Sequence, residues 1–181
     1  MSEKHWMSIL LDRLYSQFLY RDLVYVGGGI LILAVPFRVY CTLQDLIKPG
    51  WWVFVVWFLI AYALGFFAMH VGIYSRVFKM FPMCRGFVCG EVDAIRNEMR
   101  VAEEWSEAKL LLVARVSFLK HISAVLGSSS GIALALLVFY KEGLKLSAYS
   151  WWLALVVLGA VLGVMIWRNR TATAVEAELF R

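Results

Sequence analysis

The sequence predicts an all-α integral membrane protein with four transmembrane helices, an N-terminal amphipathic helix and a long cytoplasmic helix continuous with the third span. Two observations lead to this fold class. The chain is 62% hydrophobic and only 17% charged, whereas a soluble domain carries about 25% charged residues. The basic residues flank long uncharged stretches instead of forming a polar domain, so the net charge of +5 indicates a lipid bilayer and not nucleic acid as the partner.

Three of the spans are clear, because a helix needs about 20 apolar residues to cross the hydrocarbon. Uncharged runs cover residues 49–75, 121–140 and 146–167. The first run, 23–37, has only fifteen residues and contains three glycines and a proline. It becomes long enough if Arg38 extends its guanidinium to the interface. The predicted units are an N-terminal segment (1–22), a first hairpin (23–75), a loop (76–120), a second hairpin (121–167) and a tail (168–181).

The distribution of basic residues predicts the orientation. With four spans, fourteen Lys and Arg residues lie on the side of the termini and the central loop, and four lie on the other side. Without the first span the split becomes eleven against seven, which fits the positive-inside rule less well. We therefore expect a multi-pass protein of the bacterial inner membrane with both termini in the cytoplasm. The residues that we expect to anchor the outer interface are two tryptophan pairs, Trp51 with Trp52 and Trp151 with Trp152.

Two helices are expected outside the bilayer. Residues 5–20 place their apolar side chains on one face, which predicts a helix that lies in the interface plane or packs on the loop or on a partner. From Glu91 the chain has no Gly or Pro until Gly127, and its apolar residues follow a helical spacing, so one helix should run into the third span. The candidate partner-docking residues on this helix are Val92, Ile95, Met99 and Trp105.

Small residues indicate close helix packing in the second hairpin. Gly127 with Gly131, and Gly159 with Gly163, form two GxxxG pairs, and three serines lie between the first two glycines. Small residues let helix backbones approach each other where lipid gives no hydrophobic drive. The pairs could join spans three and four within one chain or join two copies of the chain, and the serines could alternatively line a polar pathway.

Two histidines are the candidate cofactor ligands. His70 near the end of span two and His121 at the start of span three are expected at one depth, and two imidazoles could hold a b-type haem or a metal. The alternative, that each is satisfied by a carbonyl group or water, is stronger, so we expect no cofactor. We also expect no metal site at Cys84 and Cys89, because their C-x4-C spacing lacks the C-x2-C pairing of zinc sites.

The sequence lacks the motifs of an enzyme. It contains no Walker sequence, HExxH, nucleophile elbow or Rossmann glycine pattern. No predicted span has a charged residue at its centre, which argues against a proton relay. We therefore expect a non-enzymatic structural or interaction subunit of a larger membrane assembly, such as a secretion, conjugation or defence apparatus, with other protein subunits as partners. A small oligomeric channel or membrane-permeabilising effector is the alternative, followed by a haem- or metal-binding redox carrier.

An offset of 100 residues gives several identities without a gap, among them Gly27 with Gly127 and both tryptophan pairs. The order of features agrees as well, so two parallel copies of one helical hairpin are one interpretation. Chance is the other interpretation, because a sequence so rich in Leu and Val matches itself at some offset.

Overall fold

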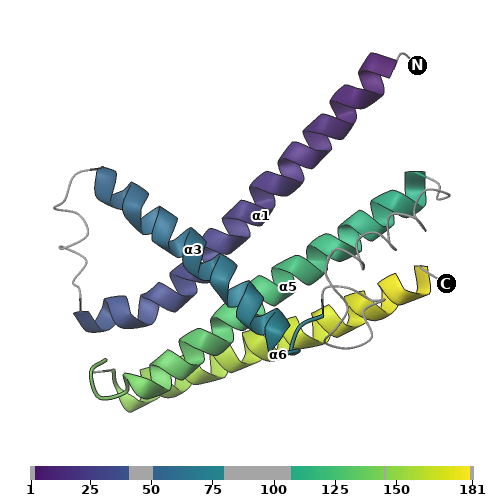
Figure 1. The fold of residues 1–181 in the computed structure, drawn as a ribbon. Helices are drawn as coiled ribbons and strands as arrows, with labels where there is room; N and C mark the ends of the chain where they lie inside the picture. Colours follow the sequence, from purple (N-terminus) through teal and green to yellow (C-terminus); the bar gives the residue numbers. More distant parts are fainter. Residues whose placement is uncertain (1–2, 41–50, 80–106, 145, 180–181) are drawn as a thin grey trace.

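The computed structural model describes residues 3–40, 51–79, 107–144 and 146–179, with side chains for 19–38, 51–79, 109, 111–144 and 146–179. These residues form four helices, α1 (Glu3–Tyr40), α3 (Trp52–Tyr74), α5 (Glu107–Phe139) and α6 (Ala148–Leu179), which pack as a bundle (Figure 1). Each helix contains a stretch long and apolar enough to cross a membrane. The prediction of an all-α protein with four candidate spans is therefore confirmed.

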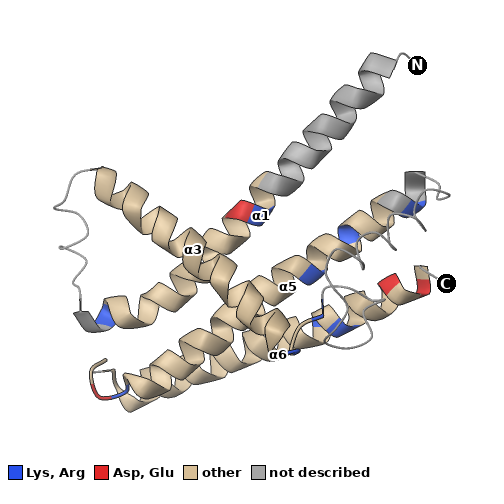
Figure 2. Cartoon of the chain, viewed as in Figure 1, with Lys and Arg blue, Asp and Glu red and all other residues tan. Residues whose placement is uncertain are grey.

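Charged residues gather toward the ends of the bundle. Figure 2 shows long uncharged lengths of helix, with Lys, Arg, Asp and Glu beyond them. The beginnings of α1 and α5 and the end of α6 lie at one end of the bundle (Figure 1). We call this the basic end, because Lys109, Arg115, Arg168 and Arg170 lie there. The opposite end, which carries Arg38 and Lys141, is called the hairpin end.

The amphipathic segment and the first span are one helix, which differs from the predicted pair. α1 runs without interruption from Glu3 to Tyr40 and includes Pro36. The three glycines at 27–29 do not break it, because in an apolar environment the helix is the conformation that pairs every backbone group within the segment. An in-plane position for residues 5–20 would therefore require a bend that α1 does not show. The predicted helix from Glu91 is seen only from Glu107 onward, and residues 91–106 lie outside the described residues.

α5 is the central helix of the bundle. It packs against α1, α3 and α6, whereas α6 packs mainly against α5. The side of α3 that faces its neighbours is made of small or slender residues: Ala61, Gly65, Ala68, Met69 and Gly72. Large apolar side chains on α3 and α6 face outward instead, among them Phe58, Phe67, Val156 and Trp167. This inside-out distribution suits helices surrounded by lipid, where burial of large apolar residues gains nothing.

The closest helix approach occurs between α1 and α3. A Cβ atom added to Gly29 would overlap the backbone of Ala61, and one added to Gly65 would overlap the backbone of Tyr25. Only glycine allows the two backbones to come so near. Figure 1 shows that α1 and α3 cross each other, whereas α5 and α6 lie side by side along their length. The two hairpins thus pack differently, and the internal duplication stays a prediction.

The predicted GxxxG packing in the second hairpin is not supported by these contacts. A Cβ on Gly131 or Gly159 would meet only leucine methyl groups at 3.9 Å, and one on Gly163 would meet nothing within 4 Å. Gly127 is tightly packed, but its nearest neighbour is the ring of Phe78. The glycines that the packing requires are therefore mainly in the first hairpin.

Candidate functional site

Two groups of polar and aromatic side chains that join different helices stand out among the described residues. The first, which we call the aromatic–histidine cluster, is formed by Asp22, Tyr25, Tyr62, Phe66, Met69, His70 and His121, which come from α1, α3 and α5. The second, which we call the exit-turn anchor, is formed by Phe78, Lys79, Lys120, Asn169 and Glu176. It joins the turn after α3 to α5 and α6.

Tyr25 is the centre of the aromatic–histidine cluster. Its ring meets three others edge to face, with centroid distances of 5.3 Å to Tyr62, 5.5 Å to Phe66 and 5.1 Å to His121. Its hydroxyl group donates to the sulfur atom of Met69 at 3.5 Å. Edge-to-face aromatic pairs are each worth about 0.5–1.5 kcal/mol beyond their burial. Tyr25 therefore fixes α1 against both α3 and α5.

The cluster also holds a carboxylate near the end of the uncharged part of α1. The hydroxyl group of Tyr62 donates to Asp22 Oδ1 at 3.3 Å, which links α3 to α1. Sequence reasoning missed Tyr25, Tyr62 and Asp22, because their relation depends on how α3 crosses α1.

The structure brings the two predicted ligand histidines into one cluster. The ring of His70 meets Phe66 at 4.5 Å, that of His121 meets Tyr25 at 5.1 Å, and Phe66 and Tyr25 meet each other. Each imidazole thus lies against one aromatic ring, and the two rings are in contact with each other. Within the described ranges, no three His, Cys, Asp or Glu side chains form a group suited to a metal ion. Ligation of a haem or metal by this pair stays a prediction, which a Soret band in the purified protein would establish.

The serines of α5 lie in the helix interface. Ser123 and Ser130 donate to carbonyl groups of their own helix at 2.7 Å. The hydroxyl groups of Ser128 and Ser129 are packed against Gly72 of α3 and Gly28 of α1 respectively. A glycine opposite each serine gives the hydroxyl room between helices, so these residues serve the close packing of α5 with the first hairpin.

The exit-turn anchor begins where α3 ends. Ser75 and Arg76 donate their backbone N–H groups to carbonyl groups of the last turn, and Arg76 adopts a left-handed conformation with φ of 60°. The chain then reverses, and the ring of Phe78 enters a niche against Gly72 and Gly127. Phe78 is 2% exposed. The niche exists only because both positions lack a side chain, which is the structural role of Gly127.

Asn169 of α6 holds the same turn by its backbone. Its side-chain carbonyl oxygen accepts from the N–H of Lys79 at 2.8 Å, and its Nδ2 donates to the carbonyl oxygen of Lys79 at 3.1 Å. Nδ2 also approaches the carbonyl oxygen of Lys120 at 3.4 Å. One fully buried amide therefore connects α6, α5 and the turn.

A buried ion pair completes the anchor about two turns farther along α6. Lys120 Nζ donates to Glu176 Oε2, and both side chains are almost completely excluded from solvent. Sequence reasoning treated Lys120 as the charged flank of span three and left Glu176 in the tail. The sequence shows a carboxylate, Glu176, shortly after two basic residues of α6. It does not show which residue pairs with this carboxylate, because that depends on the register of α5 against α6.

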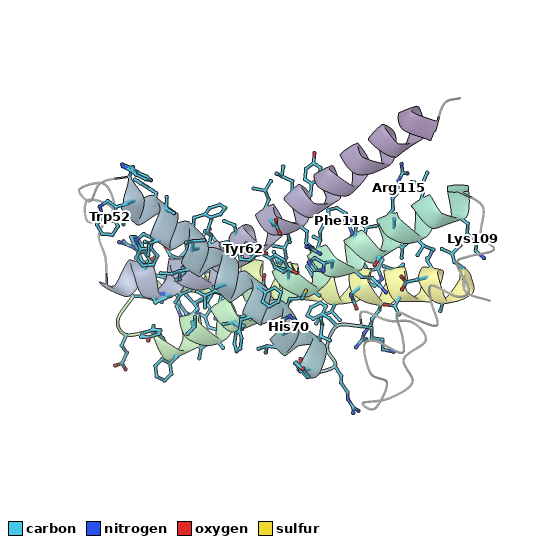
Figure 3. The ribbon with its side chains drawn as sticks, turned by 45° about the horizontal axis from the view of Figure 1, so that its top comes forward. Trp52, Tyr62, His70, Lys109, Arg115 and Phe118 are labelled. Atoms are coloured by element: carbon cyan, nitrogen blue, oxygen red, sulfur yellow. The ribbon has the colours of Figure 1, made fainter. Side chains whose placement is uncertain are left out.

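The remaining predicted residues divide by position. Trp51, Trp52, Trp151 and Trp152 lie at the starts of α3 and α6, both at the hairpin end, and Figure 3 shows Trp52 there. The indole N–H of Trp151 donates to the carbonyl oxygen of Leu137 at 3.4 Å, and Lys141 Nζ lies 4.9 Å from a Trp151 ring centroid. The docking residues Val92, Ile95, Met99 and Trp105 lie outside the described residues.

Comparisons of the chain with protein-family models, curated proteins and solved structures found no match. The function is therefore argued from the geometry of the fold and its buried polar groups.

Proposed function

We propose that this chain is a non-enzymatic structural subunit of a larger assembly in the bacterial inner membrane, such as a secretion, conjugation or defence apparatus. In this proposal the basic end faces the cytoplasm, and α5 and α6 present a stiff hairpin to other protein subunits.

The observation that carries the proposal is the buried polar joint of the second hairpin. α5 and α6 both continue beyond the uncharged runs 121–140 and 146–167. The Lys120–Glu176 pair and the Asn169 bonds lie at this boundary and hold the two extensions together. A buried pair of this kind adds little net stability over apolar packing, but it can specify one register and one geometry. A defined extension suits a docking element better than a solvent-exposed tail.

Exposed apolar side chains on the extensions support a protein partner. Leu112 on α5 is 44% exposed and Val175 on α6 is 39% exposed. Both lie outside the uncharged runs 121–140 and 146–167, on the parts of α5 and α6 that carry Arg115 and Arg170. In this proposal they contribute to the contact with the partner.

Site-specific crosslinking in cells tests the proposal. A photoreactive amino acid at Leu112 should give a crosslink to a different protein, and the same product should form at Val175. The matched control is Val138, which is also exposed and lies on α5 at the hairpin end. A crosslinked protein common to Leu112 and Val175 and absent at Val138 is the expected result, whereas only crosslinks between copies of this chain, or none, would contradict the proposal.

A further inference from the structure

We propose that the side of α6 that faces away from the bundle is the contact surface between two copies of this chain in the membrane. This surface, which we call the outward face, consists of exposed residues that share one side of the helix: Val156, Ala160, Gly163, Val164 and Trp167. The inference does not depend on the partner proposed above, because that partner contacts the extensions of α5 and α6 beyond the uncharged runs.

The two sides of α6 carry the reverse of the residue distribution on α3. On α3 the small residues Gly65 and Gly72 face the neighbouring helices, and large side chains such as Phe58 face outward. On α6 the middle of the outward face is formed by Ala160 and Gly163. The side of α6 that packs on the bundle is made of large apolar residues: Leu155, Leu158, Leu162, Met165 and Ile166. Small residues are enriched where transmembrane helices meet, so the composition of α6 favours a further helix on its outward side.

Gly163 has open space on its outward side. A Cβ atom added to it would meet no atom of the described residues within 4 Å. Glycine inside a helix costs about 1 kcal/mol relative to alanine. At Gly29 and Gly65 that cost is offset, because each allows a close approach of two backbones. Of the two contacts that its GxxxG spacing permits, the one within the chain is not made, and the contact with a second copy is left.

Gly163 also differs from the other open glycine of the bundle. Gly27 meets nothing within 4 Å among the described residues, but the large side chains of Leu23 and Ile30 stand exposed one turn before and after it. The residues one turn before Gly163 are Gly159 and Ala160. Gly159 lies at the edge of the outward face, where a Cβ would meet only a methyl group of Leu134 at 3.9 Å. Three small residues thus form one continuous surface on α6, which the surroundings of Gly27 do not.

The side chains around the small residues suit close packing against another helix. Val156 is 64% exposed and Val164 is 50% exposed. Branching at Cβ leaves valine one strongly preferred χ1 rotamer in a helix. These side chains therefore lose little conformational entropy when a second helix packs on them. Valines beside glycines offer a rigid ridge next to a shallow groove, which is a surface that can fit a copy of itself.

The membrane restricts the symmetry of this contact. Two copies inserted with the same orientation form a closed dimer about a twofold axis along the membrane normal, so the outward face meets itself with the two α6 helices parallel. Helices that meet through GxxxG pairs cross at about 40°. They therefore separate on both sides of the crossing, which keeps Arg168 and Arg170 of one copy away from those of the other. The extensions of α6 stay accessible to a different partner.

Disulfide formation in native membranes tests the contact. In full-length protein with the three native cysteines replaced by Ser, Ala160→Cys should give a disulfide-linked dimer on oxidation with copper phenanthroline. The matched control is Ile60→Cys, which should stay monomeric. Ile60 is exposed on α3, and it follows Trp52 by eight residues as Ala160 follows Trp152, so the two thiols lie at a similar depth.

A bulky residue at Gly163 gives an independent test with the purified protein. Gly163→Leu places a side chain on the open side of α6 and should hold the second helix away. In mild detergent, sedimentation equilibrium should then show a shift from dimer to monomer, while the circular dichroism spectrum stays that of the wild type. Ala63→Leu is the control, because Ala63 is exposed on α3 and the same enlargement there should leave the dimer intact.

Several results would overturn the proposal. A wild-type protein that is monomeric in detergent and gives no disulfide-linked dimer from Ala160→Cys in membranes has no such contact. Equal disulfide formation by Ala160→Cys and Ile60→Cys would show random collision, and equal loss of the dimer in Gly163→Leu and Ala63→Leu would show a contact that is not specific to α6. Capture of a different protein by Ala160→Cys, without a second copy of this chain, would assign the outward face to that protein instead.

Discussion

At the scale of single residues, buried polar side chains decide which segments meet. Asn169 is the clearest case, because one amide bonds to the backbone of Lys79 and Lys120 and so joins three segments. Lys120 and Glu176 add a buried charge pair. Either member alone would leave an uncompensated charge in the helix interface. A buried polar group that loses its partner costs more free energy than an apolar group at the same place. Substitutions can therefore test both the Asn169 bonds and the Lys120–Glu176 pair.

Removing one member of the ion pair should destabilise the protein more than removing both. Lys120→Met leaves Glu176 buried without its cation, which costs about 3–5 kcal/mol, whereas Lys120→Met with Glu176→Leu leaves two apolar groups. We expect the unfolding temperature in detergent, followed by circular dichroism, to be lowest for Lys120→Met and to recover in the double variant. A double variant at least as unstable as the single one would contradict the role of the pair.

Asn169→Ala should weaken the attachment of the exit turn. The change leaves the N–H and the carbonyl group of Lys79 without their side-chain partner, and each unpaired buried group costs about 1–3 kcal/mol. Limited proteolysis should then cut the chain after α3 faster than in the wild type. Thr171→Ala is the control, because the Thr171 hydroxyl is exposed and donates only to Trp167 of its own helix at 3.0 Å. Equal cleavage of the two variants would argue against the anchor.

At the scale of helices, glycine sets how closely two elements approach. α1 and α3 cross where Gly29 meets Ala61 and where Gly65 meets Tyr25. The rings of Tyr25, Tyr62 and Phe66 then close around the crossing. Between α5 and α6, in contrast, leucine side chains lie opposite Gly131 and Gly159, and the tight packing at Gly127 is mainly against the ring of Phe78.

Two neighbouring glycines of α1 should respond oppositely to the same substitution. Gly29→Ala places a Cβ inside the backbone of Ala61, so the crossing must open and the unfolding temperature should fall. Gly27→Ala meets nothing within 4 Å, and it should be neutral or stabilising by up to about 1 kcal/mol because alanine is the better helix former. Equal behaviour of the two variants in thermal unfolding would contradict the close approach of α1 and α3.

At the scale of the whole molecule, the arrangement of charged ends around an uncharged middle determines how the bundle sits in a bilayer. The beginning of α1, the beginning of α5 and the end of α6 share the basic end (Figure 1). Four candidate spans require the basic end and the hairpin end to be on opposite sides of the membrane. The positive-inside rule then favours a cytoplasmic basic end.

Cysteine labelling checks this orientation. Glu142 and Glu178 are exposed at the hairpin end and the basic end respectively. In a background with Cys41, Cys84 and Cys89 replaced by Ser, Glu142→Cys should react with a membrane-impermeant maleimide in spheroplasts. Glu178→Cys should react only after permeabilisation. The reverse pattern would invert the topology, and labelling of both residues in intact spheroplasts would show that α6 does not cross the membrane between them.

The sequence predicted the four spans well and the contacts between them poorly. Uncharged runs of about 20 residues are a property of the chain alone, so the spans at 49–75, 121–140 and 146–167 coincide with parts of α3, α5 and α6. The predicted GxxxG packing is not supported by the contacts within one chain, because a motif says that a close approach is allowed but not which helix takes it. Packing of these glycines between two copies of the chain stays a prediction. His70 and His121 were expected near one another from depth alone, and the structure adds the tyrosine that lies against His121.

The amino-acid sequence by itself determined that the protein belongs in a bilayer, because hydrophobic length and the flanking charges act independently of any partner segment. Only the tertiary structure decided that Gly29 and Gly65, and not the glycines of the second hairpin, carry the tight crossing. It also decided that Lys120 pairs with Glu176 and that Asn169 holds the exit turn. The reason is physical, since apolar helices in lipid have many rotations of similar energy, and steric fit and buried hydrogen bonds select among them.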